Sequence, residues 1–138
     1  MSADFSKFAK RIEEAYFVWL TTVRADGMPQ PTPVWFIREN DTFLVYTIPT
    51  SQKVKNIRHS PKVALNYSVD KEGEEYFVIM GDGVIDESTP PPDKNAAYLE
   101  KYGAGIIRIG MSVQSFTQTY SLPIRITPTH VRGDNEES

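Results

Sequence analysis

The sequence predicts a small, mainly β protein in which the strands form a barrel and a few short helices close it. Two observations lead to this fold class. Short stretches rich in β-branched and aromatic residues recur along the chain, and turn-forming residues separate them. Helical spacing of apolar residues is confined to a few brief segments. With 138 residues and no long linker, residues 1–138 are expected to form a single domain.

An amphipathic helix is expected within residues 1–16, where it would lie on the barrel as a lid. Ser2 or Asp4 can cap this helix. Its apolar residues recur at helical spacing, namely Phe5, Phe8, Ala9, Ile12 and Tyr16.

The first two strands are expected at residues 17–24 and 32–38, with a turn at Asp26-Gly27 between them. Prolines alternate with other residues at positions 29, 31 and 33. Proline has no N–H to donate, so these three cannot all lie inside a central ladder. We therefore expect an edge strand, or a strand whose backbone faces a ligand.

Residues 43–67 form the segment around which the rest of the chain is organised. Residues 43–48 are rich in β-forming side chains and predict a strand. Ser51 can cap a short helix, which Pro61 ends because proline disfavours helical geometry in the residue before it. Residues 62–68 then alternate apolar and polar side chains, which predicts a second strand.

The start of this short helix is a candidate anion site. A helix N-terminus presents unpaired N–H groups and a partial positive charge. Ser51, Gln52 and Lys53 lie in the first turn, and Thr47 ends the preceding strand, so hydroxyl, amide and ammonium groups surround one helix end. A phosphate group suits this arrangement. The same residues also fit an ordinary capped helix with solvated lysines.

Two more strands and two more helices are expected in the remainder of the chain. Gly81 and Gly83 indicate a bulge or bend in the first of these strands. Asp93 is expected to cap the first helix, and Gly103 to end it. The expected segments are a turn at 70–74, a strand at 76–85, helices at 93–102 and 112–120, a strand at 122–131, and a frayed tail at 134–138.

Composition excludes several classes of function. A net charge of −3 and a pI near 5.4 disfavour a nucleic-acid-binding protein. No stretch approaches the roughly 20 apolar residues of a membrane span, and no apolar signal opens the chain, so we expect a cytoplasmic protein. The absence of cysteine excludes disulfides and thiolate catalysis. His59 and His130 lack a second ligand at useful spacing, so no metal site is expected.

Three segments, in order, resemble the pyridoxamine 5'-phosphate oxidase-like FMN-binding split-barrel superfamily of flavin and deazaflavin proteins. Residues 46–65 are similar to its phosphate-binding strand, helix and strand, through Tyr46-Thr47, Ser51-x-Lys53, Asn56-Ile57 and Pro61-x-Val63-x-Leu65. Residues 27–36 look like its first hairpin. Residues 120–133 resemble the last strand of a subfamily assigned to coenzyme F-420.

This resemblance implies a six-stranded split β-barrel with Greek-key connections, paired as a homodimer, with a cofactor in each groove between the chains. The implied cofactor is coenzyme F-420 or flavin mononucleotide (FMN), which itself carries the chemistry, so no catalytic side chain is required. Gln52-Lys53 replaces the Arg-Lys pair of oxidases that make pyridoxal phosphate, so that activity is not expected. The candidate cofactor-binding residues are Gln30, Pro33, Val34, Trp35, Thr47, Ser51, Gln52, Lys53, Lys55, Asn56 and Arg58.

Three functions fit these observations. The first is hydride transfer between coenzyme F-420 and a small organic substrate, and the second is an FMN-dependent oxidoreductase. The third is a non-enzymatic protein on the same fold that holds a flavin, haem or another tetrapyrrole. Lys53, Lys55 and Arg58 suit either a flavin phosphate or the longer anionic tail of F-420. Trp35 is equally compatible with a place in the core or at a dimer interface.

Overall fold

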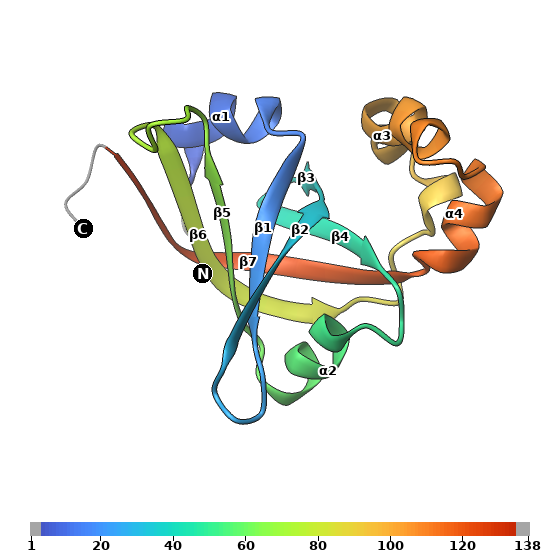
Figure 1. Ribbon diagram of the computed structural model, residues 1–138, viewed down its shortest axis with the longest axis horizontal. Coiled ribbons are helices and arrows are strands. Elements are labelled where there is room, and N and C mark those ends of the chain that lie inside the picture. The colour runs from blue at the N-terminus through green and yellow to red at the C-terminus, as the bar shows by residue number, and fades with distance from the viewer. Residues whose placement is uncertain (1–3, 135–138) are drawn as a thin grey trace.

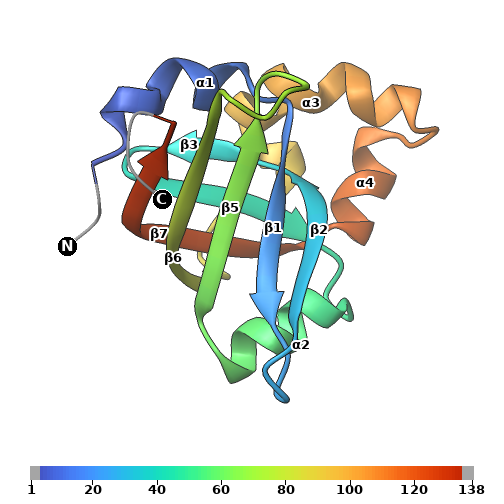
Figure 2. The same cartoon turned by 60° about the vertical axis from the view of Figure 1, so that its left-hand side comes forward.

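The computed structural model describes residues 4–134 and is mainly β, as the sequence predicts (Figure 1). Seven strands form one antiparallel sheet in the order β2-β1-β5-β6-β7-β4-β3. The strands are β1 (Phe17–Val23), β2 (Pro29–Trp35), β3 (Ile37–Glu39), β4 (Thr42–Thr47), β5 (Lys62–Ser68), β6 (Tyr76–Ile85) and β7 (Leu122–Gly133). The sheet curls strongly, and the long strands β6 and β7 cross from one side of the half-barrel to the other (Figure 2).

Four α-helices surround this sheet. They are α1 (Ala9–Glu14), α2 (Gln52–His59), α3 (Ala96–Arg108) and α4 (Val113–Thr119), with 3-10 turns at Ser6–Phe8 and Pro92–Lys94. Helices α1 and α2 lie at opposite ends of the half-barrel, and α3 and α4 pack together at its side (Figure 1). Within the described residues, none of the helices has the length and apolar character that crossing a membrane would require.

The strand count is seven instead of six because the strand expected at residues 32–38 divides at Phe36. Its two parts, β2 and β3, lie at opposite edges of the sheet. A single residue therefore links the two edges, and the curled sheet closes there. The Tyr102 hydroxyl accepts a hydrogen bond from Phe36 N–H at 2.8 Å and lies 2.6 Å from the carbonyl oxygen of Tyr16. These hydrogen bonds satisfy backbone groups at the crossing from β2 to β3, where the chain leaves one strand pairing and has not yet entered the next.

Strand β4 is buried on both faces, which explains its continuous apolar sequence. Phe43 and Val45 point into the core inside the half-barrel. Leu44 and Tyr46 point to the other side, where they contact a second cluster formed with α3 and α4. The buried members of this second cluster are Ile37, Leu44, Tyr46, Tyr98, Tyr102, Ile106 and Phe116.

The helix expected at residues 93–102 is the clearest error in the sequence analysis. Asp93 lies in a 3-10 turn, and Asn95 caps α3 by accepting a hydrogen bond from Tyr98 N–H at 3.1 Å. The helix then passes through Gly103 and ends at Arg108. Glycine at position 105 allows close packing, since a Cβ there would lie 2.1 Å from the Tyr16 hydroxyl. Gly103 is therefore a helix-interior residue and does not end the helix.

Both ends of the chain also differ from expectation. The N-terminal helix ends at Glu14, and its N-cap residue is Phe8, not Asp4. Asp4 Oδ1 accepts a hydrogen bond from Ser6 N–H at 2.9 Å, just before the 3-10 turn, without capping the helix. Strand β7 continues to Gly133, two residues beyond the expected end. Asp134 is held by an ion pair with Arg11, so the expected frayed tail does not begin there. Ser2 and residues 135–138 lie outside the described residues.

The other expectations for the strands are confirmed. Strands β5 and β6 have the predicted bounds, and a register shift between Met80 and Gly81 forms the predicted bulge. A Cβ on Gly81 would lie 2.2 Å from the carbonyl oxygen of Thr127, so only glycine fits this bend. Strand β2 is an edge strand, as its prolines indicate.

Candidate functional site

Helix α2 begins where the sequence predicts, directly after Ser51. The Ser51 side chain makes no capping hydrogen bond, and its hydroxyl lies 3.3 Å from the Thr47 hydroxyl at the end of β4. The backbone N–H groups of Gln52 and Lys53 belong to the first turn, which has no helical acceptors. Two hydroxyls and the positive end of α2 therefore lie together, as an anion site requires.

Lys53 is the side chain of this turn that most favours an anion. Its amine is half-buried and forms no hydrogen bond or ion pair with any described residue. Burial lowers the pKa of Lys53 from its ordinary value. An anion beside the amine would favour its charged form, because opposite charge favours ionisation. Thr47 and Lys53 border the same groove, and Ser51 lies beside Thr47 without lining any of the three hollows along β2, so the groups at this helix end have the chemistry that suits a phosphate.

A chain of amide side chains extends from α2 to β2. Gln52 Nε2 donates to Asn56 Oδ1, and Asn56 Nδ2 donates to Gln30 Oε1, each at 2.9 Å. Asn56 Nδ2 also donates to the Thr22 hydroxyl at 2.9 Å. Asn56 is only 2% exposed, and these bonds occupy its amide. Its role in the structure is to fix Gln30, whose Nε2 forms no bond with a described residue.

The open edge of β2 carries hydrogen-bond acceptors and almost no donors. Pro29, Pro31 and Pro33 each lie opposite a β1 residue in the ladder. A hydrogen-bonded antiparallel pair needs two N–H groups, so each proline must occupy a non-hydrogen-bonded pair. The carbonyl groups of these three prolines then face away from β1. Trp35 is two residues beyond Pro33, so its carbonyl and its N–H face the same way, and it is the one residue of these four that has an N–H to offer there.

Three adjoining hollows follow β2. A groove of about 190 Å³ is lined by Pro33, Val34, Trp35, Tyr46, Thr47, Lys53, Tyr98, Ile109, Phe116 and Tyr120. A hollow of about 360 Å³ is lined by Thr22, the 28–32 segment, Gln52, Lys53 and Asn56. A third, of about 400 Å³, is lined by Phe17, Trp19, Pro33, Val34 and Trp35. Lys53 borders the first two, and residues 33–35 border the first and third.

Trp35 contributes to the groove mainly as part of an aromatic stack. Its indole lies parallel to the Tyr102 ring, with centroids 4.6 Å apart, and stacks on Phe116 at 5.8 Å. The indole is therefore engaged by these two rings, and residues 33–35 offer a ligand their backbone and the remaining surface of the indole. Lys55 and Arg58 are exposed on α2 and line none of the three hollows.

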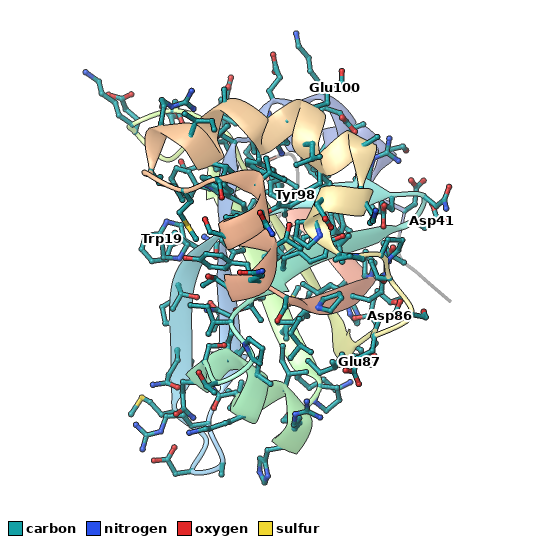
Figure 3. The ribbon with its side chains drawn as sticks, turned by 90° about the vertical axis from the view of Figure 1, so that its right-hand side faces the viewer. Trp19, Asp41, Asp86, Glu87, Tyr98 and Glu100 are labelled. Atoms are coloured by element: carbon teal, nitrogen blue, oxygen red, sulfur yellow. The ribbon has the colours of Figure 1, made fainter. Side chains whose placement is uncertain are left out.

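The sequence analysis missed the wall of the groove that α3 and α4 supply. Tyr98, Phe116 and Tyr120 come from these helices, and Figure 3 shows Tyr98 in the middle of the molecule beside them. Phe116 and Tyr120 lie at helical spacing in the sequence, but this spacing does not indicate what their shared face contacts. No motif indicates that these helices fold against the end of β4, because that contact joins distant segments. Among residues 4–134, no three candidate metal ligands come together.

The sequence matches the model of the family described as pyridoxamine 5'-phosphate oxidase over residues 6–133, so the chain belongs to this family. The match covers nearly all of the sheet, the edge strand β2 and the helices around the groove. No curated protein matches the sequence.

Solved structures share the fold at low sequence identity. An F420 reductase has a TM-score of 0.65 and 24% identity, over 88% of this chain and 92% of that one. General stress protein 26 of Bacillus anthracis has a TM-score of 0.70 and 21% identity, over 95% and 93%. HutZ, the heme storage protein of Vibrio cholerae, has a TM-score of 0.65 and 14% identity, over 95% of each chain. The fold therefore occurs both in a reductase and in a protein that holds haem.

Proposed function

We propose that this protein is an oxidoreductase that binds coenzyme F-420 or FMN along β2 and transfers hydride to or from a small organic substrate. The cofactor supplies the hydride chemistry, and the protein supplies binding, orientation and exclusion of water. Membership of the pyridoxamine 5'-phosphate oxidase family and the likeness to an F420 reductase support this class of cofactor.

The observation that carries the proposal is the unpaired, half-buried amine of Lys53 at the start of α2. A cation withdrawn from water without a partner is costly unless a ligand supplies the counter-charge. Lys53 would hold the cofactor phosphate together with the Thr47 and Ser51 hydroxyls. It borders the groove and the hollow beside Gln30, so a chain of ligand atoms can pass from one to the other along β2.

The pyrimidine end of a flavin or deazaflavin fits the open edge of β2. That end carries a ring N–H, which needs an acceptor, between two carbonyl oxygens, which need donors. The outward carbonyls of Pro31 and Pro33 supply acceptors, and Gln30 Nε2 and Trp35 N–H are available as donors. These groups are fixed by the ladder and by Asn56 before a ligand arrives, which reduces the entropy lost on binding.

We also propose that the chain works as a homodimer. Phe17 and Trp19 project from the outer face of β1 and are 40% and 43% exposed. The prolines of β2 lie beside them, and the hollow they share adjoins the groove. A second copy on this face would cover the aromatic side chains and supply the missing wall of the cofactor site, since ligand sites are common at interfaces.

Haem binding is the second candidate, and the likeness to a heme storage protein is its support. Histidine and cysteine are frequent ligands of haem iron. The groove contains neither, and the two histidines are exposed, one at the end of α2 and one on β7. The groove residues thus favour a flavin or deazaflavin.

The test compares three alanine variants in titrations of the apo-protein with FMN and with F-420. Losing a charge-assisted hydrogen bond of roughly 1.5–3 kcal/mol should weaken binding to Lys53→Ala by about 10- to 150-fold. Lys55→Ala removes the same charge from the same helix but lines no hollow, and Lys71→Ala removes it from the distant β5–β6 turn. Both controls should retain affinity within about threefold, because exposed charges contribute little. Equal affinities for all three variants would exclude Lys53 as the phosphate ligand.

A further inference from the structure

The hydroxyl of Tyr98 is a buried polar group without a hydrogen-bond partner among residues 4–134. Tyr98 is 1% exposed, lines the groove, and forms no hydrogen bond with any described residue. Its oxygen is not sealed inside the protein, because the fully enclosed hydroxyls without a partner among residues 4–134 are those of Thr32 and Thr117. Since Tyr98 borders the groove, the groove is the open space beside this side chain.

Neighbouring buried tyrosines show that this arrangement is unusual. The Tyr46 hydroxyl donates to the Pro90 carbonyl at 2.5 Å and accepts from Asn95 Nδ2 at 3.1 Å. The Tyr102 hydroxyl bonds the backbone at the crossing between β2 and β3. Buried tyrosine hydroxyls normally find a partner. A tyrosine that lacks one beside a binding groove is suited to bond a ligand.

The packing of Tyr98 fixes the direction of its hydroxyl. Its backbone N–H is held by the Asn95 cap, in the first turn of α3. Its ring is perpendicular to Tyr46 at 4.8 Å and contacts Tyr102 at 4.9 Å between centroids. Phe116 of α4 closes a third side, at 6.1 Å. These three ring contacts restrain the side chain, so the hydroxyl keeps its position beside the groove before a ligand binds.

The hydroxyl acts as a donor over the whole physiological pH range. Burial raises the pKa of Tyr98 far above its ordinary value, and the absence of a carboxylate from the groove leaves no group to take its proton. It does not serve as an acid or a base. Its free O–H is therefore available to a ligand that presents an acceptor oxygen or nitrogen.

We propose that Tyr98 donates a hydrogen bond to a ring carbonyl oxygen of the bound flavin or deazaflavin, as a second anchor independent of the phosphate site at Lys53. The proposal rests on the proposed function, because it requires that class of cofactor. It adds a site residue on α3, a helix that the sequence resemblance does not connect with the cofactor. The two anchors come from different helices and bind different parts of one ligand. Lys53 of α2 binds the anionic phosphate, and Tyr98 of α3 binds a neutral carbonyl oxygen.

The experiment uses FMN and riboflavin, which share the ring system but differ in the phosphate. Tyr98→Phe removes only the hydroxyl and should weaken both ligands by the same factor, about 3- to 12-fold for one neutral hydrogen bond. Lys53→Ala should weaken FMN and leave riboflavin unchanged. Raman spectra of bound riboflavin should show a ring carbonyl stretch shifted to higher frequency in Tyr98→Phe, since the hydrogen bond weakens that C=O bond. Tyr67→Phe, which loses a tyrosine hydroxyl on β5 outside the groove, is the matched control.

Thermal unfolding of the apo-protein separates a ligand contact from a structural role. Tyr98→Phe should keep or raise the midpoint, because it removes a buried hydroxyl with no partner. A variant of unchanged stability, weaker flavin binding and a shifted carbonyl band establishes the anchor. Unchanged affinities and an unchanged band, with normal flavin binding by the wild type, would overturn this inference alone. Failure of the wild type to bind FMN, riboflavin and F-420 would overturn it together with the proposed function.

Discussion

Replacing Tyr102 with phenylalanine tests how the half-barrel closes. The Tyr102 hydroxyl accepts from Phe36 N–H and lies within hydrogen-bond distance of the Tyr16 and Phe36 carbonyls. Phe36 is 1% exposed, so water cannot replace the lost acceptor. An orphaned buried N–H costs about 1–3 kcal/mol, and the hydrogen bond lost to a carbonyl adds about 1 kcal/mol. We expect Tyr102→Phe to lower the free energy of unfolding by about 2–4 kcal/mol.

Urea unfolding followed by circular dichroism measures this difference, with Tyr98→Phe as the matched control. The two tyrosines are one helical turn apart on α3 and are equally buried, but only the Tyr102 hydroxyl has protein partners. The control should therefore unfold within about 0.5 kcal/mol of the wild type. Equal losses in the two variants would mean that the ring packing, and not the hydroxyl at Phe36, secures the closure.

Three further predictions concern glycine packing and lysine ionisation. Gly103→Ala should raise the free energy of unfolding by about 0.5–1 kcal/mol, because the site is helical and has open space for a Cβ. Gly81→Ala should lower it by about 1–3 kcal/mol, because the added Cβ would clash with the Thr127 carbonyl. Urea unfolding of the two variants shows whether the changes have these opposite signs. Burial lowers the pKa of Lys101 to about 8 from 10.5, so the unfolded chain binds more protons between these values and wild-type stability rises with pH there. From pH 7 to pH 10 the free energy of unfolding of the wild type should rise by about 1 kcal/mol relative to that of Lys101→Met, allowing for solvent screening, and no relative change would contradict the lowered pKa. The pKa of Lys53 is also lowered in the free protein, and a bound phosphate would raise it, so FMN affinity should fall as pH rises through the free-protein pKa in the wild type but not in Lys53→Ala.

The local parts of the fold were predictable from the sequence. Strands β5 and β6, the bulge at Gly81 and the start of α2 after Ser51 all follow from alternation, glycine placement and capping chemistry. Each of these predictions depends on residues that lie close together in the sequence. The edge position of β2 was predictable for the same reason, since proline restricts hydrogen bonding wherever it stands.

The features that failed depend on contacts between distant residues. Gly103 looks like a helix stop, but α3 continues through it because the buried face of the helix packs on the second cluster, which outweighs a propensity cost of about 1 kcal/mol. The division of the second strand at Phe36 reflects closure of the whole sheet.

The candidate site shows the same limit. Its α2 end was visible in the sequence, whereas the wall with Tyr98 depends on α3 folding over β4. The partners that hold Asn56, and the exposure of Lys55 and Arg58, likewise could not be predicted without the tertiary structure.

The most direct test of the central claim is a fluorescence titration of the wild-type apo-protein with FMN and with F-420, alongside light scattering to count chains. We predict saturable binding of at least one of these cofactors, with one molecule bound per chain of a dimer. A monomer that binds neither cofactor, whether or not it binds haem, would contradict it.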